Sequence, residues 1–368
     1  MKKVTNDPKD HDFIRTEENY LFCVIGYSHP EDRIISYLKY VPNITGKWKL
    51  HISTAKGSGK RRIIPLMRVL NHYSAEQVLK SYDILLYDYL KYVYDCPISK
   101  IKITAVPYEA IKEYYKPQER IESLYNLYNK NKLDTLQRKT IEFIDFLSEN
   151  SKINTSNFGV TGSILTNTHN ITFSDIDLTV HGRMNGQVIQ NILLELFEGN
   201  NNEISRLNPK EAEDWRKNKM KNFNFNKTQA NLLFERRWNM GNFKRTRFSI
   251  HPIRTDEEIL EKYGDLEFIP KDIVEIEGIV TQDEDSLFLP CKYEISDVTI
   301  LKGPKIDDIM EICSYEGLYC SMVRKGETFR AKGKLEEVID NKKNKTYYRL
   351  LIGSYLAKSQ DYLLPILN

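Results

Sequence analysis

The chain has 368 residues, a formal net charge of +3 and a composition that is 40% hydrophobic and 29% charged. This length allows two or three domains, each with its own hydrophobic core. The composition is typical of a soluble globular protein, no apolar run is long enough to span a bilayer, and the first residues lack the apolar core of a signal peptide. We therefore expect a cytoplasmic protein with no membrane partner, while a net charge this small neither requires nor excludes nucleic acid.

The first hundred residues predict an N-terminal α/β region, residues 1–104. Residues 1–15 are polar and are expected to be frayed, whereas the apolar run Tyr20–Tyr27 predicts a buried strand. After Glu31, apolar residues at helical spacing predict a helix that ends at Pro42. These apolar residues are Ile34, Ile35, Leu38 and Val41. A second helix is expected over Ser74–Tyr94 and a short strand over Ile101–Val106.

A basic segment, Lys56–Arg62, contains the sequence Gly-Ser-Gly-Lys but does not fit a phosphate-binding loop. That loop needs a glycine five residues before its second glycine, and a serine or threonine after the lysine. Here Thr54 and Arg61 take those two positions. We expect instead a basic loop that can contact a polyanion.

A mostly helical region follows up to Asn150, and its last helix is the best defined. Asp134 and Gln137 have the spacing of a capping box. The residues after them form one apolar helical face. This face contains Leu136, Thr140, Phe143, Ile144 and Leu147.

The stretch Asn157–Gly182 carries the residues with the most specific chemistry. An apolar run, Phe158–Val160, leads into a small-residue turn at Gly162–Ser163, where backbone amides and a hydroxyl could bind a phosphate. A second strand-like run, Phe173–Val180, contains Asp175 and Asp177, which share one face if the run is a strand. Two adjacent carboxylates repel each other unless a cation lies between them, so this pair predicts a metal site.

An amphipathic helix over Val188–Leu196 is followed by a segment, residues 200–241, that is rich in basic and aromatic residues. Such interleaving suits nucleic acid, and it equally suits a pair of helices with buried rings and solvated charges. The residues concerned are Trp215, Arg216, Lys217, Lys219, Lys221, Phe223, Phe225, Arg236, Arg237 and Trp238. Lys244–Arg254 then predicts a strand on which Arg245 and Arg247 share a face, next to Lys244, so that they could bind one anion.

From Phe268 onward the sequence consists of short β-like runs between Gly, Pro and Asp turns. This pattern predicts a compact β-barrel or sandwich-like domain over residues 266–368. The five cysteines form no C-x-x-C pair, so we expect free, buried thiols and no zinc site. They are Cys23, Cys96, Cys291, Cys313 and Cys320.

The Gly162–Ser163 turn followed by Asp175–Ile176–Asp177 resembles the signature of the nucleotidyltransferase superfamily that includes DNA polymerase β. The sequence of the stretch is also similar to that of archaeal proteins described as predicted nucleotidyltransferases. The resemblance implies a mixed sheet with helices over residues 105–265, flanked by the other two regions in an α+β protein. It further implies that Gly162 and Ser163 bind the phosphates of an NTP, and that Asp175 and Asp177 bind Mg²⁺ or Mn²⁺.

The family has a third carboxylate on a neighbouring strand, and this chain departs from that pattern. The expected strand, Arg247–Ile253, carries Ser249 and His251 but no acid. His251 could act as a base in its neutral form, and Glu275 or Glu277 could replace the acid only if their strand lies beside Asp177.

We therefore predict an enzyme that transfers a nucleoside monophosphate from an NTP to a hydroxyl of a nucleic acid, a protein or a small molecule. The alternative is a catalytically weak protein that retains the fold and binds nucleic acid or a protein partner.

Overall fold

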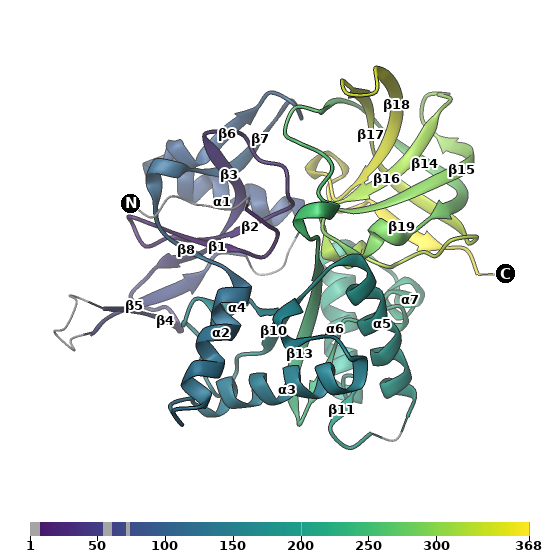
Figure 1. The fold of residues 1–368 in the computed structure, drawn as a ribbon. Helices are drawn as coiled ribbons and strands as arrows, with labels where there is room; N and C mark the ends of the chain where they lie inside the picture. Colours follow the sequence, from purple (N-terminus) through teal and green to yellow (C-terminus); the bar gives the residue numbers. More distant parts are fainter. Residues whose placement is uncertain (1–7, 54–60, 71–73, 200, 368) are drawn as a thin grey trace.

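The computed structural model describes residues 8–53, 61–70, 74–199 and 201–367. It contains three β-sheets of eight, five and six strands, and helices pack against all three (Figure 1). This confirms a mixed α+β fold, while the division at residues 104 and 265 stays a prediction. None of the helices among the described residues is both long and apolar enough to cross a membrane. All five cysteines are free, and four of them are buried, as predicted.

The N-terminal sheet follows the order β4-β5-β3-β2-β1-β8, and β7 pairs with both β3 and β6. Its elements are β1 (Phe13–Thr16), β2 (Leu21–Val24), β3 (Arg33–Pro42), β4 (Trp48–Ser53), β5 (Arg61–Arg68), α1 (Ala75–Asp88), β6 (Val93–Cys96), β7 (Ile101–Pro107) and β8 (Ile111–Tyr115). The strands expected at Tyr20–Tyr27 and Ile101–Val106 are confirmed as β2 and β7.

Two expectations for this region are wrong. The predicted helix after Glu31 is the strand β3, in which Ile34, Ser36 and Leu38 are buried in alternation, with a period of two. Of residues 1–15, which were expected to be frayed, 1–7 lie outside the described part of the chain, while 13–15 belong to β1, whose residues are all buried. Of the predicted basic loop, residues 56–60 lie outside the described part of the chain.

The central sheet has the order β11-β12-β13-β10-β9. Strand β10 lies between β9, which is antiparallel to it, and β13, which is parallel to it. The elements of this region are α2 (Pro117–Tyr128), α3 (Thr135–Ser151), β9 (Phe158–Val160), α4 (Gly162–Leu165), β10 (Ile176–His181), α5 (Arg183–Glu198), β11 (Ile204–Ser205), α6 (Pro209–Phe223), α7 (Lys227–Glu235), β12 (Met240–Phe243) and β13 (Thr246–Ile253).

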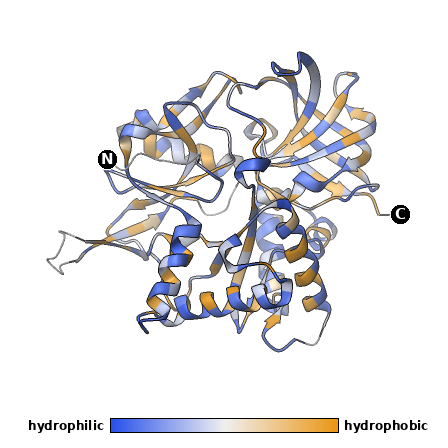
Figure 2. Cartoon of the chain, in the orientation of Figure 1, coloured by the Kyte–Doolittle hydropathy of each residue, from blue (hydrophilic) through white to orange (hydrophobic). Residues whose placement is uncertain are grey.

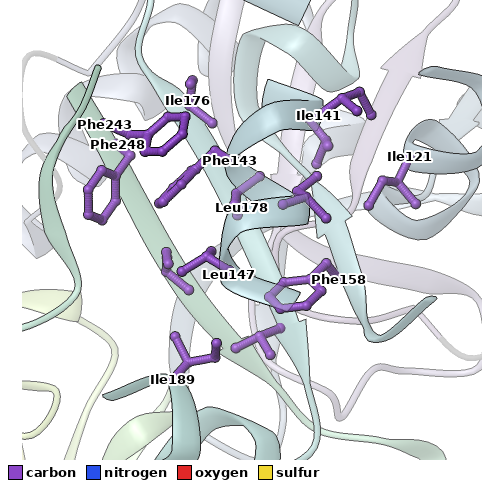
Figure 3. Close-up of a cluster of buried hydrophobic side chains, with 14 of the residues drawn as sticks. Ile121, Ile141, Phe143, Leu147, Phe158, Ile176, Leu178, Ile189, Phe243 and Phe248 are labelled. Atoms are coloured by element: carbon purple, nitrogen blue, oxygen red, sulfur yellow. The ribbon is translucent and has the colours of Figure 1, made fainter. Parts of the chain in front are cut away.

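Helix α3 and the central sheet share one hydrophobic core. Asp134 caps α3 and forms the predicted capping box with Gln137. All five residues of the predicted apolar face are buried. Phe143 stacks on Phe243 of β12, with ring centroids 4.7 Å apart. Figure 3 shows the converging side chains of α3, β9, β10 and β13. This packing fixes β10, the strand that carries Asp177, between β9 and β13.

The C-terminal sheet follows the order β14-β15-β16-β18-β17-β19, and β17 also pairs with β14. Pairing therefore runs in a closed circuit through five strands. Hydrophobic and hydrophilic residues alternate along these strands (Figure 2). The strands are β14 (Leu266–Gln282), β15 (Cys291–Lys302), β16 (Ile309–Ser314), β17 (Thr328–Asp340), β18 (Lys345–Ile352) and β19 (Tyr362–Pro365).

The basic and aromatic segment of residues 200–241 joins the central and C-terminal sheets. Phe223, Phe225 and Leu233 are buried in the same cluster as side chains of β14 to β19. Arg237 is buried and donates to the carbonyl oxygens of Gly317, at 2.8 Å, and Leu318. The rings therefore belong to a core, as the second of the two interpretations of this segment expected.

Candidate functional site

The Gly-Ser turn and the Asp-x-Asp motif meet at one end of β10. The backbone N–H of Thr161 donates to the carbonyl oxygen of Asp177 at 2.9 Å. Asp177 lies within β10, and Asp175 precedes the strand by one residue. The sequence predicted both acids within one strand, but β10 begins at Ile176, between the two acids.

Gly162 lies directly against the side chain of Asp177. Its φ is +64°, and an added Cβ would lie 2.3 Å from Oδ2 of Asp177. Any other residue would have a strained backbone and would collide with the carboxylate. The residue before α4, Thr161, forms no side-chain cap, so the first amides of α4 gain no partner from it. Ser163 follows in this first turn and is buried.

Asp175 and Asp177 repel each other. Burial raises the pKa of Asp175 to about 6, and the charge of Asp177 adds to the rise. Arg247 of β13 and Arg68 of β5 oppose the rise with their positive charges. The side chain of Asp175 still contacts solvent, so it can exchange protons or bind a cation. A cation bound between the two carboxylates would remove the repulsion.

Ser249 occupies the place on β13 that faces Asp177. The two residues are register partners, and Oγ of Ser249 donates to Oδ1 of Asp177 at 2.6 Å. Oγ of Ser249 also lies 2.8 Å from Nε2 of His251. Since the hydroxyl hydrogen points to Asp177, Nε2 of His251 carries the hydrogen of the second bond. Burial lowers the pKa of His251 well below its usual value, and the neighbouring His11 adds to this effect. His251 therefore orients Ser249, and its role as a base stays a prediction.

Among the described residues, Glu211 of α6 is a further acid whose charge raises the pKa of Asp175, but its carboxylate accepts the side-chain amide of Asn242 at 2.8 Å. Glu275 and Glu277 lie on β14 of the C-terminal sheet, where they bind Lys302 and Arg330. Within the described part of the chain, no three His, Cys, Asp or Glu side chains are grouped so as to hold a metal ion. The site therefore offers two carboxylates and the hydroxyl of Ser249.

The three predicted phosphate-binding cations do not lie together. Lys244 and Arg245 form the turn between β12 and β13, with φ values of 45° and 64°. Lys244 pairs with Glu142 at 3.0 Å and Glu203 at 3.1 Å. The expectation that Arg245 and Arg247 share a strand face is wrong, because Arg245 precedes the strand. Arg247 is exposed, and its positive charge lowers the pKa of Asp175. Of the three cations, it is therefore the one that lies near the carboxylates.

The N-terminal segment reaches the same site, which sequence analysis missed. Oγ1 of Thr161 donates to the carbonyl oxygen of His11 at 2.8 Å. The rings of His11 and His251 are stacked, with centroids 4.1 Å apart. The only sequence signal was a run of charged residues, Asp10-His11-Asp12, directly before a buried strand.

Comparison with known proteins agrees with this geometry. Residues 140–239 match the family model of the nucleotidyltransferase domain, which confirms the resemblance drawn from the Gly-Ser turn and the Asp-x-Asp motif. The match ends before Ser249 and His251. The uncharacterized protein MJ1086 of the archaeon Methanocaldococcus jannaschii is 28% identical over 355 residues, which cover 96% of this chain and 97% of that protein. No solved structure matches the chain. The domain match indicates nucleotidyl transfer with an NTP as substrate.

Proposed function

We propose that this protein is a metal-dependent nucleotidyltransferase that transfers a nucleoside monophosphate from an NTP to a hydroxyl acceptor. The observation that carries the proposal is the contact between Gly162 and Asp177. It brings backbone amides suited to phosphate within contact distance of a carboxylate suited to a cation. A nucleic acid, a protein or a small molecule could supply the hydroxyl.

The two carboxylates fit Mg²⁺ or Mn²⁺. Mg²⁺ is commonly bound through one or two carboxylates together with substrate phosphates and water, and does not require a cage made only of protein. Asp175 and Asp177 supply oxygen ligands, and the raised pKa of Asp175 reflects a repulsion that a cation would relieve. When bound, the cation would neutralise charge on the phosphates and on the leaving pyrophosphate.

The chain's own residues would bind and orient the nucleotide. The amides at Gly162 and Ser163 would hold phosphate oxygens, and Arg247 would neutralise one more phosphate charge. Ser249 would hold Asp177 in one rotamer through its hydrogen bond. Lys244 and Arg245, in the turn, would contribute only long-range positive charge.

Calorimetric titration with Mg²⁺ or Mn²⁺ plus ATP tests the metal site. Asp177→Ala should abolish metal-dependent nucleotide binding, whereas Asp214→Ala, which removes an exposed carboxylate of α6, should not. A transfer assay with α-labelled ATP then offers RNA, glycerol and the protein itself as acceptors. Equal binding by the wild type and Asp177→Ala, with no transfer by either, would overturn the proposal.

One observation favours the alternative, a catalytically weak protein that binds nucleic acid or a partner. Ser249 faces Asp177 on the strand where the resemblance leads us to expect a third acid. In that case metal and nucleotide would bind normally, but no acceptor would be labelled. We also propose a cytoplasmic location, a division into three domains and a barrel-like C-terminal domain.

A further inference from the structure

Asp10 and His11 form a hydrogen-bonded pair, and His11 stacks on His251, which reaches Asp177 through Ser249. Nδ1 of His11 lies 2.5 Å from Oδ2 of Asp10. The other carboxylate oxygen of Asp10 accepts the backbone N–H of Gly26 at 3.1 Å. The Asp10 side chain is only 2% exposed, so its orientation is fixed. An acid held in this way makes Nδ1 the protonated nitrogen and leaves the lone pair on Nε2.

Two further contacts hold His11 in place, one at its backbone and one at its ring. Its backbone carbonyl accepts the hydroxyl of Thr161, the residue before the Gly-Ser turn. Its ring stacks on His251, which binds Ser249, the partner of Asp177. The side chain keeps 18% of its surface exposed, so a ligand can still reach it.

The backbone of His11 is strained. Its φ is 66°, in the left-handed region that residues with a Cβ seldom adopt. Such conformations cost free energy and persist where the surrounding structure imposes them, often at functional sites. Here the backbone is held on both sides, by the bond from its N–H to the carbonyl oxygen of Val24 at 3.1 Å and by the bond from Thr161 to its own carbonyl oxygen.

The polar side chains beside Asp177 on β13 are already engaged. The Ser249 hydroxyl donates to Asp177, and Nε2 of His251 is occupied by Ser249. Glu211 of α6, whose charge also raises the pKa of Asp175, accepts the backbone N–H of Asn208 at 2.9 Å and the side-chain amide of Asn242 at 2.8 Å. No side chain of the described residues bonds Nε2 of His11, which leaves a lone pair for the hydroxyl proton.

We propose that His11 is the general base for the acceptor hydroxyl, and that Asp10 orients it. This inference rests on the proposed nucleotidyl transfer. Nε2 of His11 takes the proton from the hydroxyl, and the hydroxyl oxygen forms a bond to the α-phosphorus. The bond from that phosphorus to the bridging oxygen breaks, and pyrophosphate leaves with the electron pair. The imidazolium is stabilised by Asp10, so the N-terminal region supplies the proton acceptor that the family takes from its third acid.

The variant His11→Gly tests this assignment. Glycine accepts the left-handed backbone, and the space left by the imidazole lies against the ring of His251, where free imidazole can stack. We expect kcat to fall by about 100-fold or more, within the range of general-base catalysis, with the KM for ATP little changed. Added imidazole should restore at least about tenfold of the lost rate and should saturate.

Binding and stability separate this role from a structural one. His11→Gly should keep the calorimetric Mg²⁺–ATP affinity and the Tm of the wild type. Asp10→Asn should lower kcat without rescue by imidazole, and imidazole should not rescue Asp177→Ala.

Two results would overturn the inference while leaving the proposed function intact: a His11→Gly enzyme as fast as the wild type, or a slow one that has a lower Tm and no response to imidazole. A wild type that neither binds metal–ATP through Asp177 nor labels any acceptor overturns the proposed function, and the inference falls with it.

Discussion

Gly162→Ala should damage both the stability and the metal site, by two separable effects. The first is the backbone, because φ is +64° and alanine in the left-handed region costs about 1–2 kcal/mol. The second is the collision of the new Cβ, 2.3 Å from Oδ2 of Asp177. The carboxylate must turn away and lose its 2.6 Å bond from Ser249. A hydrogen bond to a charged group contributes about 1.5–3 kcal/mol, so the total loss is about 2.5–5 kcal/mol.

Gly264→Ala is the matched control. Gly264 also has a positive φ, +91°, but an added Cβ there would meet nothing within 4 Å. It therefore carries the backbone cost without the collision. We expect thermal unfolding to place the Tm of Gly162→Ala at least about 3 °C below that of Gly264→Ala.

Calorimetric titration with Mg²⁺ and ATP measures the second consequence. Gly162→Ala should lose metal-dependent binding, because Asp177 no longer points into the site, while Gly264→Ala should bind as the wild type does. Equal Tm values for the two variants, or full binding by Gly162→Ala, would refute the geometry on which the site is built.

Two further predictions concern charge. The pKa of Asp175 in the folded protein, about 6, lies above its ordinary value of 3.8, so ionisation of this carboxyl destabilises the fold as the pH rises through this interval. In the absence of metal, Asp175→Asn should therefore raise the Tm at pH 8. The gain in Tm should vanish toward pH 4. A gain that is constant with pH would contradict this. Arg247→Gln should weaken Mg²⁺–ATP binding about tenfold, through loss of one charge-assisted contact, whereas Arg245→Gln in the turn should change it less than about twofold. Equal losses in both variants would place the two arginines at one anion site after all.

Local chemistry made much of the central region predictable. The capping box of Asp134 and Gln137 depends on residues three apart, and the structure contains it. The Gly-Ser turn and the Asp-x-Asp motif are likewise short-range patterns. Strand β3 was mistaken for a helix because Ile34, Leu38 and Val41 fit a helical period, while the alternating core positions included the polar Ser36, which hid the period of two.

The turn at Lys244–Arg245 carried no local signal. Two-residue turns with positive φ at both positions usually contain Asn and Gly, which tolerate that backbone. Lysine and arginine gave no such indication, so the predicted strand was begun at Lys244 instead of Thr246. The error placed Arg245 on the same strand face as Arg247 and joined three cations into one predicted anion site.

The contact between His11 and His251 could not be predicted, because no periodic pattern relates residues so far apart in the chain. The contact also indicates which stretches of the chain would form the proposed active site. Thr161 donates its backbone N–H to Asp177 and its hydroxyl to His11, so one residue links the metal strand to the N-terminal segment. The matched nucleotidyltransferase segment, residues 140–239, includes neither that segment nor β13, which supplies Ser249. If the proposed transfer takes place, the chemistry depends on three stretches of chain that the fold brings together, and the N-terminal segment that carries His11 forms part of the active site.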